Sequence, residues 1–446
     1  MSELQVYLTI GIFAAVILVI AFDLLDMTLA ALLGVGAMIV TGILGDKDFL
    51  EVPATAGGAI ALLFGGMVVA HVLDKSGVFE RLGTPFLRFT GGSGKRFLLL
   101  LVLTVAAVCA FLPNATTVIL LAPLIIRTAK ALGVNYVGPM ILTAIVSNAA
   151  GLLTLVGDPA TFIVGSAIGM TFTQYLRQVS FAGLLAVLVV VPLLPRLMPE
   201  VWNAHRALAA ARSVPRIERP YLAALALCVL AFMVLMFLFG EVLPVRIVPP
   251  SVAIVAAALA LLVIHGAKVE QVDDVLRSVD WKTLFFLGAI LCLMQGFIKT
   301  GLLQGLSLKL HGWFGTDFML VALALLAGVG VLSSVLANIP VVAASVVMTK
   351  GYLVAAEAVP ELALSGEFSE WPAAVVPVFV AMMLGGTLGG NATMIGASAN
   401  IVSVGICARE GERVSFGRFL RYGVPITVAQ LAVGTLYVLA LRWWIS

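Results

Sequence analysis

Long apolar runs separated by short polar connectors fill most of the sequence. An apolar run of about 17–25 residues is long enough to cross the hydrocarbon core of a bilayer as a helix, so we expect an all-α polytopic membrane protein with about ten spanning segments. Both termini are then expected on the outer side. Uninterrupted spanning helices are predicted at 6–22, 28–44, 59–73, 181–194, 221–240, 251–265, 283–298 and 424–441.

Polar residues interrupt the remaining apolar segments at mid-depth. The arms on either side of 113–117 and of 338–340 do not make comfortable spans, which predicts two re-entrant hairpins with those residues at their tips. The segments 138–178 and 384–410 are dense in glycine, asparagine and threonine, which predicts two broken helices. Lipid offers backbone groups no hydrogen-bond partners, so such breaks must line a protein cavity or a water-filled path.

The charged connectors assign the two sides of the membrane. The linker 196–219 is rich in arginine, and the positive-inside rule places it in the cytoplasm. The stretches 75–96 and 303–315 are expected to lie at the interface as amphipathic helices, the first of them on the cytoplasmic side. The acidic connectors 45–53 and 352–370 are then expected on the far side.

Composition supports a membrane protein. The chain is 62% hydrophobic and 11% charged, with a mean hydropathy of +1.14, whereas soluble domains are about 25% charged. The first apolar run lacks a basic start and a small-residue cleavage site, so it is expected to be a retained helix. The four cysteines form no CxxC pair and predict neither a disulfide framework nor a zinc site.

Several function classes are excluded by the motifs that the sequence lacks. It contains neither a GxxxxGK[ST] nucleotide-binding loop nor an HExxH metal motif. We therefore expect no enzyme activity, catalytic residue, cofactor, bound metal or nucleic-acid partner. Energy for transport must come from an ion gradient or from a partner ATPase.

The two halves of the sequence align as an internal repeat. Residues 75–77 match 299–301, and the same offset carries Asn114 onto Asn338. An odd number of crossings separates the copies, so they are expected to run in opposite directions, which is typical of secondary transporters. The breaks match at a slightly longer offset, where Gly151, Thr154 and Gly157 fall on Gly390, Thr393 and Gly396.

This repeat divides the chain into three parts. We expect an N-terminal half at 1–195, with the first repeat starting near residue 24. A basic cytoplasmic linker follows at 196–220. The C-terminal half at 221–446 contains the second repeat, starting near residue 248.

Two hairpin tips and two breaks are expected to converge at the centre. Helix ends leave N–H and C=O groups unpaired and carry partial charges of about half a unit, so converging breaks form a polar site with few charged side chains. Isolated asparagines and threonines often only join membrane helices, but this set is clustered and repeated. The candidate substrate- and ion-binding residues are Asn114, Thr116, Thr117, Asn148, Thr154, Asp158, Asn338, Asn391, Thr393, Ser398 and Asn400.

Asp158 is the only carboxylate inside the two broken segments, because Glu410 stands at the very end of the second. An acidic residue inside a membrane is costly and is by default a functional candidate, here as a proton carrier, a cation ligand or both. Its repeat mate is Ala397, so the site is expected to be asymmetric. The alternative role is an N-cap, because an aspartate before Pro159 is a good helix start; the two roles are compatible.

Two other side chains invite a functional interpretation. His71 could relay protons, but a hydrogen bond between helices is the favoured interpretation. Cys109 lies one turn before the first hairpin tip and could bind a thiophilic substrate. Since a three-thiolate site would need further partners, a packed thiol is favoured.

The two breaks resemble a known signature. Residues 389–400, GGNATMIGASAN, look like the GGNxTxIGASAN motif of the arsenite-permease and sodium/proton-antiporter (ArsB/NhaD-type) family of the ion transporter superfamily, which includes the pigment-cell P protein. Residues 154–159, TLVGDP, look like the family's first-half motif TxIGDPPN, with Ala160 and Thr161 in place of its Pro–Asn. The resemblance covers essentially the whole chain. It implies alternating access by a moving transport part against a scaffold, a homodimer, and a bacterial or archaeal cytoplasmic (inner) membrane.

The family transports several substrates, so we rank these substrates by how well each one suits the polar groups predicted for the central site. Amides, hydroxyls and helix ends without a buried arginine or lysine suit a small uncharged oxyacid such as As(OH)3. We therefore predict arsenite or antimonite efflux in exchange for protons. A sodium/proton antiporter using Asp158 is the second hypothesis, and a carboxylate or anion symporter is the third. A channel or the membrane subunit of an ATP-driven pump is the alternative class, but two occluding hairpins favour a carrier.

Overall fold

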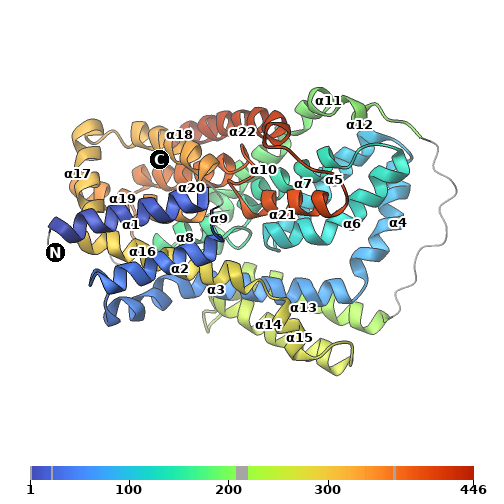
Figure 1. Ribbon diagram of the computed structural model, residues 1–446, viewed down its shortest axis with the longest axis horizontal. Helices are drawn as coiled ribbons and strands as arrows, with labels where there is room; N and C mark the ends of the chain where they lie inside the picture. The colour runs from blue at the N-terminus through green and yellow to red at the C-terminus, as the bar shows by residue number, and fades with distance from the viewer. Residues whose placement is uncertain (1–2, 22–23, 207–218, 337, 365–367, 446) are drawn as a thin grey trace.

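The chain folds into an elongated bundle of helices (Figure 1). The computed structural model describes residues 3–21, 24–206, 219–336, 338–364 and 368–445. Within these ranges every regular element is a helix, and no strand is formed. The predicted all-α fold class is therefore confirmed.

Ten helical segments in the described ranges are long and apolar enough to cross a membrane. Their number agrees with the predicted number of spans, but the set differs in two ways. The helices α6 and α19, which were predicted as hairpin arms, are long enough to span. The helix α2 (Met27–Val40), which was predicted as a span, is too short at 14 residues. The segments are α1 (Glu3–Ala21), α3 (Asp46–Lys75), α6 (Asn114–Leu132), α10 (Ser180–Leu188) with its continuation through α11 (Leu194–Leu197), α13 (Pro220–Phe239), α14 (Pro249–Gly266), α16 (Trp281–Thr300), α18 (Phe318–Val335), α19 (Asn338–Ala355) and α22 (Phe416–Ile445).

Each predicted hairpin is a pair of helices joined at a polar tip. In the first, α5 (Gly94–Cys109) is followed after a short turn by α6, whose N-cap is Pro113. In the second, α18 is followed by α19, which starts at Asn338. Figure 1 shows α5 and α6 in one half of the molecule and α18 and α19 in the other. The two hairpins thus approach the centre from opposite ends.

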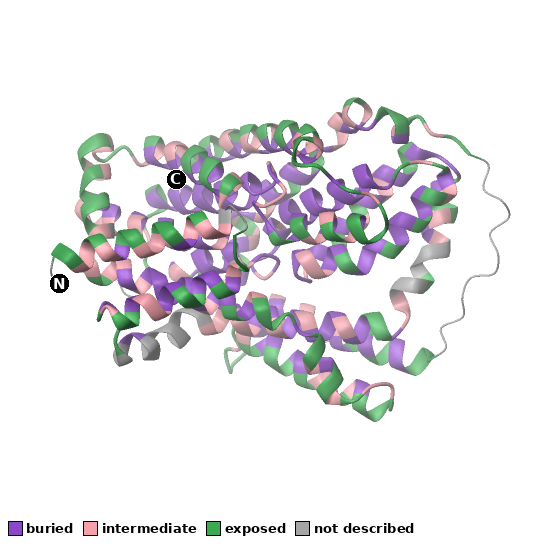
Figure 2. Cartoon of the chain, in the orientation of Figure 1, coloured by how far each residue is buried: buried purple, intermediate pink, exposed green. Residues whose placement is uncertain are grey.

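Both predicted broken helices are also present. In the first half, α7 (Val137–Ala150) and the 3₁₀ turn η1 (Gly151–Leu153) precede the break, and α8 (Pro159–Ala167) follows it. In the second half, α20 (Val376–Gly389) and α21 (Ser398–Arg409) flank the break. Every residue of α7 and α20 is buried, as Figure 2 shows. A helix that is apolar all round belongs in the core, so these two helices form the centre of the bundle.

The two predicted interfacial helices follow left-handed glycines. Gly77 precedes α4 (Val78–Thr90) and Gly301 precedes α17 (Leu302–Phe314), each with a φ of +74°. Only glycine adopts this conformation without strain, and it turns the chain out of the preceding helix. In Figure 1, α4 and α17 lie at opposite ends of the molecule, as expected for inverted copies.

Ion pairs close both ends of the contact between α3 and α16. Lys299 Nζ lies 2.6 Å from Asp48 Oδ2, which joins the end of α16 to the start of α3. Lys75 Nζ lies 3.3 Å from Glu270 Oε1, which joins the end of α3 to the segment before α16. The repeat pairs Lys75 with Lys299, so the lysines of the two ion pairs occupy equivalent positions in the two halves.

The connectors differ most from the prediction. The expected acidic connector 45–53 is largely helical because the Asp48 carboxylate accepts the Gly45 N–H at 2.6 Å and caps α3 one residue into that stretch. Short helices also form in connectors where none was predicted. These are α12 (Pro199–Trp202), α15 (Val272–Ser278), η4 (Glu361–Leu364) and η5 (Ala373–Val375). Within or next to predicted helices, α9 (Phe172–Gln178), η2 (Val191–Leu193) and η3 (Gly240–Val242) form separate short elements.

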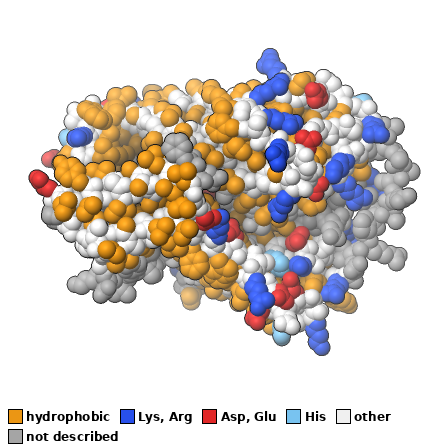
Figure 3. Space-filling model, in the orientation of Figure 1, with side chains coloured by type: hydrophobic (Ala, Val, Ile, Leu, Met, Phe, Trp, Pro, Cys, Tyr) orange, Lys and Arg blue, Asp and Glu red, His pale blue; other side chains and the backbone are white. Residues whose placement is uncertain are grey.

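The segments predicted to be cytoplasmic lie together at one end. The Gly94 N–H donates to the Ala204 carbonyl at 2.8 Å, which ties the start of α5 to the basic linker. Lys130, at the end of α6, pairs with Glu410 at 3.1 Å. Figure 3 shows lysine and arginine side chains gathered over this end. Residues 207–218 of the predicted linker lie outside the described ranges.

Candidate functional site

Both helix breaks are built around glycine pairs that bring two backbone segments into contact. A Cβ on Gly157 would lie 2.7 Å from the Gly151 carbonyl oxygen, and a Cβ on Gly396 would lie 2.5 Å from the Gly390 carbonyl oxygen. A side chain cannot be accommodated at such distances, so glycine is required here. These are the glycines that the repeat pairs, and the two breaks therefore share one backbone arrangement.

The helix after each break starts at an N-cap residue with an extended backbone. The N-cap of α8 is Asp158 (φ −138°, ψ 132°), and that of α21 is Ala397 (φ −146°, ψ 148°). Pro159 follows at the first helical position, where its missing N–H costs no hydrogen bond. The same position thus carries a carboxylate in one half and a methyl group in the other.

Two threonines tie the breaks to the hairpin arms. The Thr154 hydroxyl donates to the Ala110 carbonyl, and the Thr393 hydroxyl donates to the Ser334 carbonyl. Ala110 and Ser334 are themselves related by the repeat offset of the hairpins. Both hydroxyl protons are thereby bonded to backbone carbonyls, so these threonines support the breaks; their predicted ligand role stays a prediction.

A chain of hydrogen bonds joins the first hairpin, both breaks and α22. The Asn114 amide donates to Asn148 Oδ1 at 3.2 Å. The Asn148 amide donates to Asn391 Oδ1 at 2.9 Å and to Asn400 Oδ1 at 3.0 Å. The Asn391 amide in turn donates to Gln430 Oε1 at 2.8 Å. All five side chains are buried, so this chain crosses the centre of the protein.

The Asp158 carboxylate faces the second half of the protein. It is 3% exposed, and the Thr387 hydroxyl of α20 donates to its Oδ2 at 3.0 Å. The Asn338 side chain at the second hairpin tip and the N–H groups of Ala160 and Thr161 at the start of α8 also favour the carboxylate, although its side chain forms no cap hydrogen bond with α8. Asp158 is thus the N-cap residue by position, while its side chain contacts the opposite repeat.

No ion pair among the described residues involves Asp158. A buried carboxylate surrounded by neutral donors is costly when it is ionised and alone. Binding a proton or a cation removes that cost, which makes this position suitable for either.

A cavity of about 210 Å³ connects Asp158 with the last turns of α3. Its walls include the side chains of Asp74, Asp280 and His71, and its described lining contains no lysine or arginine. The cavity is therefore acidic and bears neutral hydrogen-bonding groups at its inner end. The predicted site residues that line it are Asn114, Thr116, Asn148, Asp158, Asn338 and Ser398.

The other predicted residues stand behind the cavity wall. Asn400 donates to the carbonyls of Gly390 and Thr393, both at 2.8 Å, and so holds the second break in shape. Thr117 is buried next to Cys109. The structure therefore places Thr117, Thr154, Asn391, Thr393 and Asn400 in a supporting shell and not on the cavity surface.

Sequence reasoning missed two polar side chains of this centre. Thr387 contacts Asp158, and Gln430 ends the asparagine chain. Thr387 is the repeat mate of Asn148, and following the offset one turn further back would have found it. Gln430 is an isolated amide in an apolar helix, which is a signal for a buried hydrogen bond.

His71 forms a hydrogen bond, as was favoured over a proton relay, but its partner Glu270 lies in the connector between α14 and α15 and not on another helix. Its Nε2 lies 2.8 Å from Glu270 Oε2, and Lys75 contacts the other oxygen of the same carboxylate. Burial opposes ionisation of Glu270, but the His71 and Lys75 side chains hold its pKa below the ordinary value. Of these three residues, His71 also lines the cavity.

Cys109 is a packed thiol. It is fully buried, and its Sγ lies 3.1 Å from Asn114 Oδ1 and 3.0 Å from the Ser147 carbonyl oxygen. Among the described residues, no group of three or more His, Cys, Asp or Glu side chains could hold a metal ion. A three-thiolate site is thus absent from the described part of the chain.

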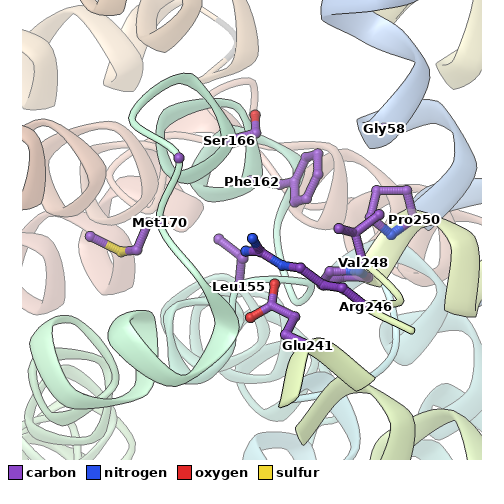
Figure 4. A pocket seen from close by; sticks show the side chains of 11 residues that line it. Gly58, Leu155, Phe162, Ser166, Met170, Glu241, Arg246, Val248 and Pro250 are labelled. Carbon is purple, nitrogen blue, oxygen red and sulfur yellow. The ribbon is translucent and has the colours of Figure 1, made fainter. Parts of the chain in front are cut away.

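A second cavity of about 300 Å³ borders the same break and shares no lining residue with the first. Phe162 and Ser166 of α8 lie on one side, and Glu241 and Arg246, from the connection between α13 and α14, lie on the other (Figure 4). The Glu241 carboxylate accepts the Phe172 N–H at 2.9 Å. Two separate cavities at one break are consistent with access from two sides.

Comparison with known proteins decides the family. Residues 17–366 match the family described as citrate transporter, CitMHS. The chain belongs to this citrate transporter family. It is 40% identical over 438 residues to an uncharacterized transporter of Synechocystis, with 98% of both chains covered. It is also 31% identical over 438 residues to an uncharacterized transporter of Mycobacterium tuberculosis, again with 98% of both chains covered.

More distant relatives of this citrate transporter family member agree with a transporter fold. The human P protein is 27% identical over 517 residues, which covers 98% of this chain and 60% of the P protein. The YdaH transporter of Alcanivorax borkumensis has a TM-score of 0.58 at 13% identity, covering 89% of this chain and 88% of that one. That likeness concerns the fold alone.

These matches settle the general class and leave the substrate open. The protein is a multi-pass membrane transporter of the secondary type that acts on a small substrate. The predicted relation to the P protein is confirmed. None of the matches named here carries the ArsB/NhaD-type specificity that the sequence motifs suggested.

Proposed function

We propose that this protein is a proton-coupled secondary transporter in which Asp158 carries the proton. The observation that carries the proposal is the position of the Asp158 carboxylate, buried at the inner end of a cavity and contacted by neutral donors. Binding a proton or a cation neutralises the Asp158 carboxylate. A neutral site moves through the low-dielectric membrane more easily than a charged one, so proton binding affects the change between the inward-facing and outward-facing states. Alternating access would thereby couple the proton to the substrate.

The acidic cavity favours an uncharged or cationic substrate. With Asp74, Asp158 and Asp280 in its described walls and no lysine or arginine, an anion would enter against repulsion. Arsenous acid and its antimony counterpart are small, uncharged at neutral pH and rich in hydroxyl groups, so they suit the Asn114 and Asn148 amides at the inner end. Efflux across the inner membrane in exchange for protons is the function that we place first.

Sodium is the second candidate, supported by the oxygen atoms around Asp158. The carboxylate and the Thr387 hydroxyl offer hard oxygen ligands of the kind that small hard cations prefer. A proton and a sodium ion would then compete for the same carboxylate, which is the basis of antiport. A carboxylate such as citrate ranks third, because its charge would have to be neutralised before it entered the acidic cavity.

The hairpins and the family resemblance support a proposal about how the transporter is driven and assembled. A carrier with two occluding hairpins needs no ATPase, so we propose that the ion gradient alone drives transport. We further propose a homodimer in the cytoplasmic membrane of the cell, with the inverted halves 1–195 and 221–446 joined by the linker 196–220.

Transport by purified protein in proteoliposomes tests this proposal. Vesicles loaded with a pH-sensitive dye would receive arsenite, sodium or citrate on one side, with potassium and valinomycin clamping the membrane potential. Arsenite-driven proton movement supports the first candidate, and sodium-driven movement supports the second. Proton movement with citrate alone, or substrate movement without protons, would overturn the proposal. Activity that requires added ATP and a partner subunit would point to a pump.

A further inference from the structure

Gln430 of α22 joins the candidate site to α10 through an amide whose orientation is fixed. The side chain is fully buried. Its Nε2 donates to the Ala186 carbonyl at 3.0 Å, and its Oε1 accepts from Asn391 at 2.8 Å. Because a backbone carbonyl can only accept, the nitrogen of Gln430 must face Ala186 and the oxygen must face Asn391.

This orientation is passed on towards the cavity. Asn391 has to turn its nitrogen to Gln430, so its oxygen faces Asn148. Asn148 then has to donate, and its two N–H groups point to Asn391 and Asn400. The oxygen of Asn148 is left to accept from Asn114. Asn148 and Asn114 both line the cavity, so Gln430 contributes to their polarity there, beside the Cys109 thiol, whose Sγ lies 3.1 Å from Asn114 Oδ1.

Asn400 contributes a second, local constraint on Asn148. The Asn400 amide donates to two carbonyls of the second break, so its oxygen is also turned to Asn148. Loss of the Gln430 contact would therefore weaken the preference of Asn148 for one orientation without abolishing it. The expected effect of a Gln430 variant is partial for this reason.

The first half of the protein shows that the fold does not need a polar pair here. Gly423 of α22 packs on Asn391, where a Cβ would lie 2.6 Å from the Asn391 carbonyl oxygen. Gly183 of α10 packs in the same way on Leu152, where a Cβ would lie 2.8 Å from Leu152. Leu152 is the repeat mate of Asn391.

The mate of Gln430 is apolar as well. Val190 follows Gly183 at the same spacing at which Gln430 follows Gly423. Leu152 and Val190 are both fully buried. An apolar pair thus occupies in the first half the positions that Asn391 and Gln430 occupy in the second half. The polar pair is therefore a feature of the second half and not a requirement of the shared backbone.

We propose that Gln430 is a positioning residue that fixes, through Asn391, which atoms Asn148 and Asn114 present to the substrate. The proposal rests on the proposed function, because the affected readout is substrate affinity at that site. It predicts that Gln430 acts on affinity separately from its contribution to stability.

Three variants separate the two contributions. Gln430→Val leaves the buried Asn391 N–H without an acceptor and should lower both thermal stability and substrate affinity. The double variant Asn391→Leu with Gln430→Val installs the apolar pair of the first half and removes the unpaired Asn391 N–H. Stability should therefore return in part, because the Ala186 carbonyl still lacks its donor, while affinity stays low. Thr427→Val is the matched control, since Thr427 is also buried on α22 and its hydroxyl has no hydrogen-bond partner among the described residues.

The measurement is KM and kcat in proteoliposomes, beside thermal unfolding in detergent. Arsenite or sodium serves as the probe, whichever drives proton movement in the wild type. We expect about a fivefold rise in KM for both Gln430 variants, the equivalent of one lost hydrogen bond, with kcat largely retained and no change in Thr427→Val. A KM that recovers together with stability in the double variant would overturn the proposal, as would an unchanged KM in Gln430→Val.

Hydrogen–deuterium exchange keeps the test independent of the substrate. If neither arsenite nor sodium moves protons in the wild type, the proposed function fails while this test still decides the positioning role. Loss of the constraint on Asn148 should speed exchange in the first break, residues 151–158, of the double variant. Exchange that rises only near residues 391 and 430 would refute a role for Gln430 beyond its own neighbourhood.

Discussion

A single added methyl group at the second break should destabilise the protein sharply. In Gly396→Ala, the new Cβ would lie 2.5 Å from the Gly390 carbonyl oxygen, 2.8 Å from the Gly390 Cα and 2.9 Å from the Ser333 carbonyl oxygen. All three atoms belong to the backbone, so no side-chain rotation can relieve the contact. Gly157→Ala in the first break should behave alike, because its Cβ would lie 2.7 Å from the Gly151 carbonyl oxygen.

The magnitude follows from two opposing effects. A carbon–oxygen contact is normally about 3.3 Å or longer, so the methyl group would intrude by several tenths of an ångström on packed backbone. Overpacking of this kind costs about 1–3 kcal/mol. Replacing glycine by alanine also restricts the unfolded chain and stabilises by about 0.4–1 kcal/mol. The clash outweighs this gain, so both variants should be destabilised by about 1–2 kcal/mol.

Thermal unfolding in detergent, followed by a thiol-reactive dye or by monodispersity after heating, provides the assay. Gly405→Ala is the matched control, because it lies in α21 and a Cβ there would meet no atom within 4 Å. We expect the control to match or exceed the wild type, since alanine is the better helix former. If Gly396→Ala proved as stable as Gly405→Ala, the close backbone contact at the break would be wrong.

Three further predictions follow from individual contacts. Thr387→Val should reduce transport about tenfold, because it removes the hydroxyl that donates to Asp158, whereas Thr387→Ser should retain it; initial rates in proteoliposomes distinguish the two. Cys109→Ser should transport nearly as well as the wild type, because the thiol is buried and bonded; arsenite transport abolished by this change would instead indicate a thiolate ligand. Glu270 has a pKa below its ordinary value of 4.5, so its ion pairs contribute stability above that value and lose it as the pH falls through the lowered pKa. Unfolding temperatures of wild type and Glu270→Gln should therefore differ at pH 7 and converge in acid.

The order of elements could be predicted because membrane insertion imposes simple rules. Apolar length gave the spans, and polar interruptions such as 113–117 gave the hairpin tips and breaks. Short connecting helices escaped prediction because local capping bonds decide them. The contact of the Asp48 carboxylate with the Gly45 N–H, which extends α3 into the expected acidic connector, is one such bond.

The residues that form the candidate site could be predicted, but the directions of their side chains could not. Clustering and repetition placed Asn114, Asn148 and Asp158 at one cavity, where the structure finds them. The direction of Thr154 and Thr393 could not be foreseen, because side chains at a helix break follow no helical period. Both turn to hairpin carbonyls that lie far away in the sequence.

The sequence motif predicted the architecture of the protein better than its substrate. The motif at 389–400 consists largely of the glycines and asparagines that build a break, and a break is needed whatever is transported. Such a motif identifies the architecture better than the substrate. The resemblance to arsenite permeases and sodium/proton antiporters therefore leaves the substrate open, and the family that the chain belongs to is the citrate transporter family.

Proton coupling is proposed to depend on the Asp158 carboxylate, and the Asp158→Asn variant decides whether it does. The measurement is substrate flux and proton flux in the same proteoliposomes, with exposed Asp273→Asn of α15 as the control. We predict that Asp158→Asn loses substrate-driven proton movement and the response of substrate flux to a pH gradient, while the control behaves like the wild type. Proton-coupled transport with unchanged stoichiometry and pH dependence in Asp158→Asn would show that another group carries the proton.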